Sequence, residues 1–308
     1  MKYIVSGATG FIGKKLIENL LKDQNNIIYA LIFESEKESF NSIETDNLVP
    51  IICDLEKKDN DFSQISENID CFFHFAWVGV SPDSRKIFDV QFRNINITVN
   101  CLKLAKEKKA KKFIAPGSTN EYLYSGTLIN KDTIPAPKDS YGSVKVALRY
   151  LQKQFCEEEK IDFMYIIITG IYSEYRRDKN IISYTIDSLL NNKSPSLTKC
   201  EQLWDYVHID DVVEAIKCIS KKGKPNRIYA IGHGDNWQLK NYIKIIHELI
   251  NPNITIGFGD IPYNSEVLPM SCMDLTDLIN DTGFKPKIDF KEGIRRVIDN
   301  WNSTNFEK

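Results

Sequence analysis

Short apolar runs alternate with longer amphipathic stretches through residues 1–169. The runs are bounded by polar or glycine-containing segments and cover residues 2–6, 27–33, 49–53, 71–75, 112–116 and 163–169. Runs of this length and character predict β-strands. The run at 163–169 is apolar up to its last residue, which predicts a strand that is buried on both faces of a sheet.

The stretches between these runs predict helices over residues 14–22, 90–108 and 141–158. Strands that alternate with helices along a chain predict a doubly wound parallel sheet. The alternation breaks after residue 169. There we expect a helix within 176–192, a strand over 205–209, a helix over 211–220 with Asp210 as its N-cap, another sheet strand over 227–231, and helices near 239–250 and 291–301.

The sequence therefore predicts an α/β protein with a sheet domain and a smaller C-terminal lobe of mixed α/β structure. In this interpretation residues 1–169 and 203–233 form the sheet domain. Residues 170–202 and 234–308 form the lobe, which is built from excursions of one chain.

Composition narrows the classes of partner. The net charge of −2 over 308 residues gives no reason to expect nucleic acid or a membrane surface. No apolar run is long enough to span a membrane, and a strand at the very N-terminus leaves no room for a signal peptide. The seven cysteines are scattered without a CxxC pair. We therefore expect free buried thiols, no metal centre and a cytoplasmic location.

A glycine-rich turn follows the first predicted strand. Gly7, Gly10 and Gly13 stand at GxxGxxG spacing between that strand and the first predicted helix. Gly7 permits a tight turn, Gly10 lets a phosphate approach the backbone, and Gly13 lets the helix pack on the strand. The N–H groups at the helix N-terminus then face the anion. The turn predicts a dinucleotide pyrophosphate site.

Acidic residues follow the second and third predicted strands. Glu34 is placed to bind the adenosine ribose hydroxyls, which favours NAD over NADP; alternatively it is a solvated charge in a charged loop. Asp54 is placed to meet the adenine amino group.

A second chemical signal is the pair Tyr141 and Lys145, which share one face of a predicted helix because they are four residues apart. A nearby ammonium favours the phenolate. The phenol can then take a proton from a sugar hydroxyl or give one to a ketone as hydride moves.

Together these features resemble the extended short-chain dehydrogenase/reductase family of nucleotide-sugar epimerases, dehydratases and 4-ketoreductases. The resemblance covers nearly the whole chain. Its marks are the glycine-rich turn, Asp54-Leu55, residues 74–77, Asn94, residues 117–122, the Tyr141/Lys145 pair, residues 202–211, and residues 281–286 followed by 292–294. The resemblance implies a Rossmann fold and an NAD(P) cofactor.

The resemblance also implies roles for individual residues. Tyr141 is the expected acid/base, Lys145 its partner, and Thr119 the residue that hydrogen-bonds the reacting sugar oxygen, with Ser118 as the alternative. Cofactor contacts are expected from Gly7, Thr9, Gly10, Phe11, Ile12, Gly13, Glu34, Asp54, Leu55, Phe75, Ala76, Trp77, Asn94, Tyr141 and Lys145. Substrate contacts are expected from Trp77, Asn120, Glu121, Thr169, Arg176 and Gln202.

Departures from the family pattern bear on the reaction. The 4,6-dehydratases of the family carry an acid pair after the Thr, whereas here Asn120 replaces the first acid and Glu121 keeps the second, a candidate catalytic group. Trp204 stands where an Arg often grips the diphosphate, and Arg176 or Arg177 is the alternative source of that charge. Trp77 replaces a small residue, where it either narrows the sugar pocket, stacks on a base or packs in the core.

We expect an NAD(P)-dependent enzyme that exchanges hydride at C4 of a nucleotide-activated sugar. The favoured reaction is reduction of a 4-keto-6-deoxy sugar nucleotide in surface polysaccharide biosynthesis, because the chain is short for a dehydratase and the acid pair is incomplete. The alternatives are a 4-epimerase, a 4,6-dehydratase and, more remotely, a non-catalytic NAD(P)-binding sensor.

Two further expectations follow from the resemblance. The choice between NADH and NADPH stays open, because Glu34 opposes a 2′-phosphate whereas Ser35 and Lys37 could bind one. A homodimer is expected through helices near 92–108 and 141–157. The apolar candidates for that interface are Ile95, Val99, Leu102, Ala147, Leu148 and Leu151; alternatively, these residues face the sheet.

Overall fold

The computed structural model of the chain describes residues 1–43, 45–122, 128–175, 177, 180–264 and 270–301. A seven-stranded sheet in the order β11-β6-β5-β4-β1-β2-β3 forms its larger part, and every neighbouring pair is parallel. The strands are β1 (Lys2–Ser6), β2 (Ile27–Ile32), β3 (Leu48–Ile52), β4 (Cys71–His74), β5 (Lys112–Pro116), β6 (Asp162–Ile168) and β11 (Arg227–Ile231). The predicted doubly wound parallel sheet is confirmed.

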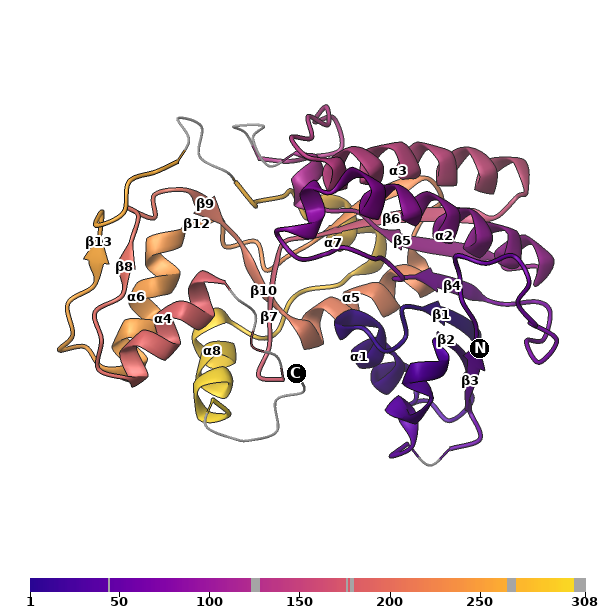
Figure 1. Cartoon of the computed structure of the whole chain (residues 1–308), viewed down its shortest axis with the longest axis horizontal. Helices are drawn as coiled ribbons and strands as arrows, with labels where there is room; N and C mark the ends of the chain where they lie inside the picture. Colours follow the sequence, from indigo (N-terminus) through magenta and orange to yellow (C-terminus); the bar gives the residue numbers. More distant parts are fainter. Residues whose placement is uncertain (44, 123–127, 176, 178–179, 265–269, 302–308) are drawn as a thin grey trace.

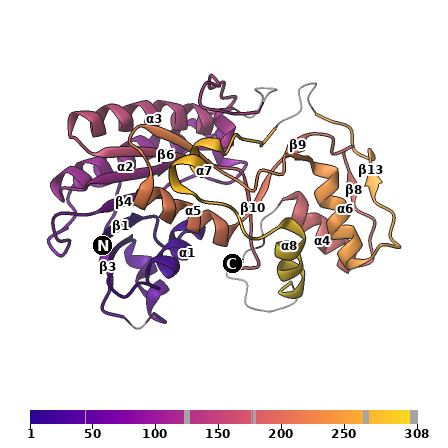
Figure 2. The same ribbon diagram turned by 180° about the vertical axis from the view of Figure 1, so that it is seen from behind.

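Helices cover both faces of this sheet (Figures 1 and 2). One layer contains α1 (Phe11–Leu20), α5 (Ile209–Lys222) and α7 (Thr276–Thr282), and the other contains α2 (Phe88–Glu107) and α3 (Ser140–Glu158). Each layer has its own buried apolar cluster. Leu16, Val212 and Leu278 belong to the first, and Ile97 and Cys156 to the second. None of the helices among the described residues has the length and apolar character needed to span a bilayer.

The lobe lies beside the carboxyl edge of the sheet and has a third apolar cluster (Figure 1). Its helices are α4 (Ile181–Leu190), α6 (Leu239–Ile250) and α8 (Phe290–Asp299). Aromatic rings fill the centre of the cluster, where the Tyr242 and Phe290 rings meet edge to face at 4.7 Å and Tyr206 packs against both. Two-stranded pairs frame the lobe: β7 (Gly170–Tyr172) with β10 (Tyr206–His208), β8 (Ser196–Leu197) with β13 (Gly257–Phe258), and β9 (Leu203–Trp204) with β12 (Trp237–Gln238).

The C-terminal region departs from the expected division. Met273 and Leu275 lie in the cluster under α2 and α3, and Leu278 and Phe284 lie in the cluster under α1 and α5. This stretch therefore packs with the sheet, although the sequence interpretation assigned all of 234–308 to the lobe. Helix α7 was not anticipated, because seven residues give too little periodicity to identify.

The expected N-cap of α5 is wrong. His208 is the N-cap, and its ring Nδ1 accepts the backbone N–H of Asp210, which lies in the first turn of the helix. The expected dimer faces also need correction, because Leu102 and Leu148 are buried against the sheet side whereas Leu151 is 52% exposed. The cysteines are free, and all but the half-buried Cys218 are buried, as expected.

Asp211 joins α5 to the C-terminal region. Its carboxylate is 4% exposed and accepts the backbone N–H groups of Lys287 (3.0 Å) and Ile288 (2.9 Å). Asp211→Ala removes the buried, charged acceptor of two backbone hydrogen bonds, so we expect it to lower the free energy of unfolding by about 2 kcal/mol. The neighbouring Asp210→Ala is the control, because Asp210 is partly exposed and pairs with Lys15; it should cost less than about 1 kcal/mol. Urea unfolding measures both, and equal losses would contradict the assignment.

Candidate active site

The glycine-rich turn is a close approach of three backbone segments. Gly7 has φ +67°, and a Cβ there would lie 2.6 Å from the backbone N of Ala76, just after β4. A Cβ on Gly13 would lie 2.2 Å from the carbonyl oxygen of Gly7. Gly7 and Gly13 are therefore required to bring β1, α1 and the end of β4 together.

The N-terminus of α1 fits a dinucleotide pyrophosphate. Gly10 is its N-cap and is exposed, and no acidic residue stands in its first turn. Among the residues that the structure describes, no side chain caps the helix. Its N–H groups and the positive end of the helix dipole are thus available to an anion. The partly exposed Thr9 and Phe11 flank this site, and Ile12 packs against the apolar cluster behind it.

The acid beside the turn is Glu36 rather than Glu34. Glu36 accepts the Thr9 hydroxyl (2.7 Å) and the backbone N–H of Phe33 (3.0 Å). Glu34 instead pairs with Lys37 at 3.0 Å, and its side chain is 66% exposed. The cause is the 3₁₀ helix η1 (Glu34–Phe40), which carries Glu34 outward and turns Glu36 back toward the glycines. Sequence reasoning missed Glu36 because it expected an open loop here.

The segments after β3 and β4 border the same edge of the sheet. Asp54 is partly buried, accepts the backbone N–H of Glu56 and pairs with Lys57, while Leu55 is buried. Phe75, Ala76 and Trp77 follow β4 and are partly exposed. Asn94 is different, because it is fully buried and its amide both accepts from and donates to the backbone of Val78. It holds this loop instead of lining the cofactor site as expected.

Tyr141 and Lys145 lie at the N-terminal end of α3. Asp139 caps the helix by accepting the backbone N–H of Gly142 (2.7 Å). Lys145 is 4% exposed and its Nζ donates to the carbonyl oxygen of Pro116 (2.8 Å), which ties α3 to the end of β5. Burial, with repulsion from Arg85, lowers the pKa of Lys145 to about 7. This ammonium is therefore poised near neutral pH.

The neighbours of Tyr141 differ from the expectation. Burial raises the pKa of Tyr141, and the opposing influences are a hydrogen bond with Ser118 and the charge of Arg85. The Arg85 guanidinium carbon lies 4.9 Å from the Tyr141 ring centroid, whereas Lys145 Nζ is 5.7 Å from it. Arg85 Nε is buried and has no hydrogen-bond partner among the described residues. Arg85 is thus a second cation of the site, and it has no fixed spacing from Tyr141 that the sequence could reveal.

Residues 118–120 form the turn that faces Tyr141. Ser118, the alternative in the sequence interpretation, is the residue of this turn that opposes the rise in the pKa of Tyr141. Thr119 begins the 3₁₀ helix η3 (Thr119–Glu121) and is partly exposed. Asn120 donates to the N-cap carboxylate of Asp139 at 3.4 Å. The turn is therefore braced against the start of α3.

Glu121 is withdrawn from the site. It has no exposed surface, and its Oε1 accepts the backbone N–H of Ser118 (2.9 Å) and the hydroxyl of Tyr165 (2.8 Å). Its Oε2 pairs with Arg149 Nη1 at 3.4 Å. Burial raises the pKa of Glu121 although these partners oppose the shift. The geometry does not support the expected catalytic and substrate-binding roles, because the capping of η3 turns the carboxylate inward.

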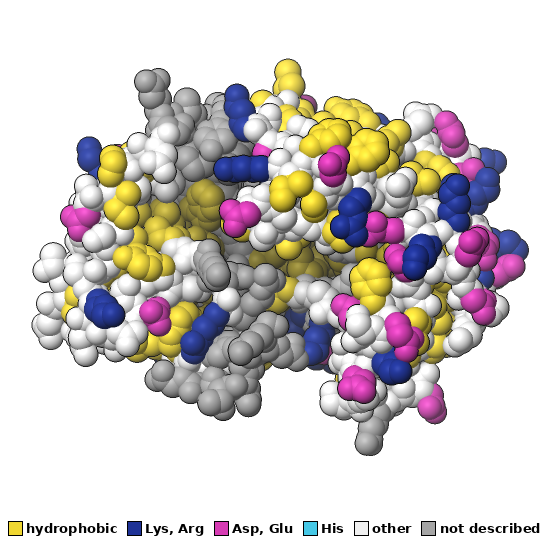
Figure 3. Space-filling model, viewed as in Figure 1, with side chains coloured by type: hydrophobic (Ala, Val, Ile, Leu, Met, Phe, Trp, Pro, Cys, Tyr) yellow, Lys and Arg dark blue, Asp and Glu magenta, His cyan; other side chains and the backbone are white. Residues whose placement is uncertain are grey.

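The remaining expected substrate contacts are Thr169, Gln202 and Arg176. Figure 3 shows a hollow in the molecular surface between the sheet domain and the lobe. Thr169 is 7% exposed, and neither its Oγ1 nor Trp204 Nε1 has a hydrogen-bond partner among the described residues. Both are buried donors. Gln202 is partly buried and accepts the hydroxyl of Tyr263 at 3.4 Å. Arg176 lies outside the described residues.

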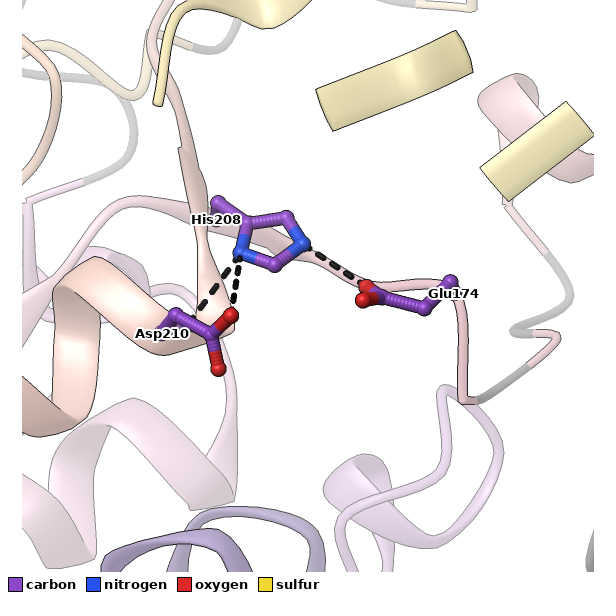
Figure 4. Close-up of side chains that lie close together, drawn as sticks. All are labelled: Glu174, His208 and Asp210. Carbon is purple, nitrogen blue, oxygen red and sulfur yellow. Dashed lines mark hydrogen bonds and ion pairs between the residues drawn. The ribbon is translucent and has the colours of Figure 1, made fainter. Parts of the chain in front are cut away.

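Glu174, His208 and Asp210 meet at the joint of β10 and α5 (Figure 4). The Nδ1 of His208 accepts the Asp210 N–H, so its Nε2 carries the proton and donates to Glu174 (2.8 Å). Burial opposes ionisation of Glu174, but the His208 hydrogen bond lowers its pKa to about 2. Because Lys15 already neutralises Asp210 at 3.1 Å, we interpret the group as a brace between the lobe and α5.

Comparison with known proteins adds three findings. A family model described as the NAD dependent epimerase/dehydratase family matches residues 3–232. Human dTDP-D-glucose 4,6-dehydratase is 26% identical over 331 residues, covering 99% of this chain and 91% of that protein. The dTDP-4-dehydro-6-deoxyglucose reductase of Escherichia coli is 24% identical and covers 96% of both chains.

A solved structure shows the same fold. The UDP-glucuronic acid 4-epimerase from Bacillus cereus, in complex with NAD, superposes with a TM-score of 0.83 over 99% of this chain and 100% of that one, at 20% identity. The order of strands and the attached lobe are therefore those of a known architecture.

The placement of Arg85 predicts a pH effect. When the reaction runs as an oxidation, Tyr141 accepts the proton of the sugar hydroxyl. The rate in that direction rises with pH as the phenol ionises. Arg85→Met removes a cation that favours the phenolate, so we expect the midpoint of that rise to move up by about 0.5–1 pH unit. Arg85→Lys keeps the charge and should move it less. The pH dependence of kcat/KM measures the effect, and an unchanged midpoint in Arg85→Met would show that solvent screens the guanidinium.

Proposed function

The chain belongs to the NAD dependent epimerase/dehydratase family, and from that premise we propose that it reduces the C4 ketone of a nucleotide-activated 4-keto-6-deoxy sugar with NADH. Such a product is a building block for surface polysaccharide. The seven unpaired cysteines fit a reducing compartment, so the proposal places the reaction in the cytoplasm.

The chain's own residues carry the proton side of this reaction. When bound, the reduced nicotinamide supplies a hydride to C4 of the sugar. The Tyr141 hydroxyl gives its proton to the ketone oxygen, which becomes the C4 hydroxyl. Ser118 orients the Tyr141 hydroxyl, and the charges of Arg85 and Lys145 stabilise the phenolate that remains. Solvent then restores the proton.

The withdrawal of Glu121 is the observation that carries the choice of reaction. Elimination between C5 and C6 needs an acid/base beyond the tyrosine, and Glu121 is engaged by Tyr165 and Arg149 while Asn120 cannot supply a proton at neutral pH. A simple ketone reduction needs Tyr141 alone.

The position of Glu36 supports NADH over NADPH. Its carboxylate lies at Thr9, beside the turn that fits the pyrophosphate, where a 2′-phosphate would meet a negative charge. Lys37 was a candidate for binding that phosphate, but it pairs with Glu34. We therefore propose NADH as the natural reductant.

A homodimer through α2 and α3 is part of this proposal. The two helices lie side by side on one face, and apolar side chains gather there on the surface (Figures 1 and 3). Phe92 on α2 is 50% exposed, and Leu151 on α3 is 52% exposed. Half-exposed apolar residues on adjacent helices are typical of a face that a partner covers.

The first test measures cofactor consumption. We expect the near-ultraviolet absorbance of NADH to fall in proportion to added 4-keto-6-deoxy sugar nucleotide, and NADPH to react more slowly in parallel. Tyr141→Phe should lower kcat/KM by about 10²–10⁴-fold. Ser143→Ala is the matched control, because Ser143 is exposed on the same helix between Tyr141 and Lys145 and bonds only to the backbone of Asp139.

Other outcomes of that assay point to other reactions. Conversion of a nucleotide sugar with constant NADH absorbance would indicate that hydride returns to the sugar in each turnover. The product would then identify a 4-epimerase, which uses the same tyrosine, or a dehydratase. Unchanged activity in Tyr141→Phe would overturn the assignment of the acid.

The second test concerns the dimer. Leu151→Glu places a charge in the proposed apolar contact, so we expect it to weaken association by about 100-fold or more. Lys153→Glu on the same helix also adds an exposed acid and should leave association unchanged. Sedimentation velocity distinguishes dimer from monomer. A monomeric parent protein would refute the interface, as would a Leu151→Glu protein that remains dimeric.

A further inference from the structure

Trp77 lies directly over the ammonium of Lys145. The distance from Lys145 Nζ to the centroid of the Trp77 ring is 3.5 Å. Trp77 also meets the ring of Tyr141 edge to face, with centroids 5.6 Å apart and planes at 80°. One aromatic side chain therefore touches both members of the catalytic pair.

Gln91 on α2 fixes the indole in this orientation. Gln91 has no exposed surface, and its Oε1 accepts the indole N–H of Trp77 at 3.1 Å. Its Nε2 donates to the carbonyl oxygens of Gly79 (2.7 Å) and Ser84 (3.0 Å). Both polar atoms of the Gln91 side chain thus form hydrogen bonds with the loop that carries Trp77. The position of the ring is imposed by the fold.

The surroundings of Lys145 explain what the ring can contribute. Arg85 from the 3₁₀ helix η2 (Ser84–Lys86) repels the ammonium, while Glu121 from η3 attracts it but is shared with Arg149. On the remaining side, burial lowers the pKa of His74 on β4 to about 3, so that imidazole is neutral. A buried ammonium with so little compensation tends to lose its proton. The π-face of an indole favours the charged form, and most strongly where water is excluded.

We propose that Trp77 is a positioning residue for Lys145: its ring, held by Gln91, keeps the ammonium protonated and directed toward the site beside Tyr141. The residue acts through the lysine and needs no contact with the sugar. This inference rests on the proposed function only for its activity readout.

The first experiment compares pH profiles of kcat/KM for NADH-dependent reduction. Activity should fall as the pH rises through neutrality and Lys145 loses its proton. Trp77→Leu removes the π-face, so we expect the alkaline limb to move down by about 1 pH unit. Trp77→Phe keeps a weaker π-face and should move it by roughly half as much.

The matched control removes a similar contact elsewhere. The Arg177 guanidinium carbon lies 4.3 Å from the Trp301 ring centroid, and Trp301 belongs to the lobe cluster. Trp301→Leu should therefore lower thermal stability without moving the limb. If both Trp77 variants lose stability while the limb stays in place, Trp77 is a packing residue only and the inference fails.

The second experiment needs no catalysis. The difference in tryptophan fluorescence between the parent protein and Trp77→Phe isolates the signal of Trp77. We expect that signal to show a transition near neutral pH as Lys145 titrates, and Lys145→Met to abolish the transition. This result would support the inference even if no sugar nucleotide were reduced. A transition that persists in Lys145→Met would overturn it.

Discussion

The contact between Gly7 and Gly13 is the constraint on which the site depends. A side chain at either position would collide with backbone, so only glycine allows α1 to start immediately beside the ends of β1 and β4. This approach leaves the N-terminus of α1 open to an anion. It also sets the starting point of the loop after β4, and hence the place of Trp77. The glycine-rich turn and the surroundings of Tyr141 and Lys145 thus depend on one close packing of backbone.

Buried charged side chains around the turn at 118–120 are the second constraint on the site. Lys145 and Glu121 are both buried, and the half-buried Arg85 and the buried Arg149 complete the group. The fold divides them into two sets. Arg149 and Tyr165 engage Glu121 behind the turn at 118–120, and Arg85 and Lys145 remain with Tyr141 in front of it. Glu121 is thus held away from Tyr141 as a structural group, whereas the Tyr141 phenol lies beside two cations that favour its ionised form.

The lobe is joined to the sheet domain by polar contacts at buried positions. Asp211 accepts hydrogen bonds from two backbone N–H groups of the C-terminal region, and Glu174 accepts one from Nε2 of His208. Each contact joins α5 or its N-cap residue to a segment of the lobe. A hydrogen bond in a buried place is costly to break, so the lobe is held in one position beside the carboxyl edge of the sheet.

The sequence alone determined the sheet, the glycine-rich turn and the Tyr141/Lys145 pair, because each is a local pattern: apolar runs, glycine spacing, and two residues on one helix face. It could not determine which acid meets the turn, since a 3₁₀ helix decides between Glu34 and Glu36. Nor could it show that Glu121 faces inward or that Arg85 and Gln91 belong to the site. Those outcomes depend on contacts between segments distant in sequence, which only tertiary packing brings together. The same packing decided that Trp77 lies over Lys145.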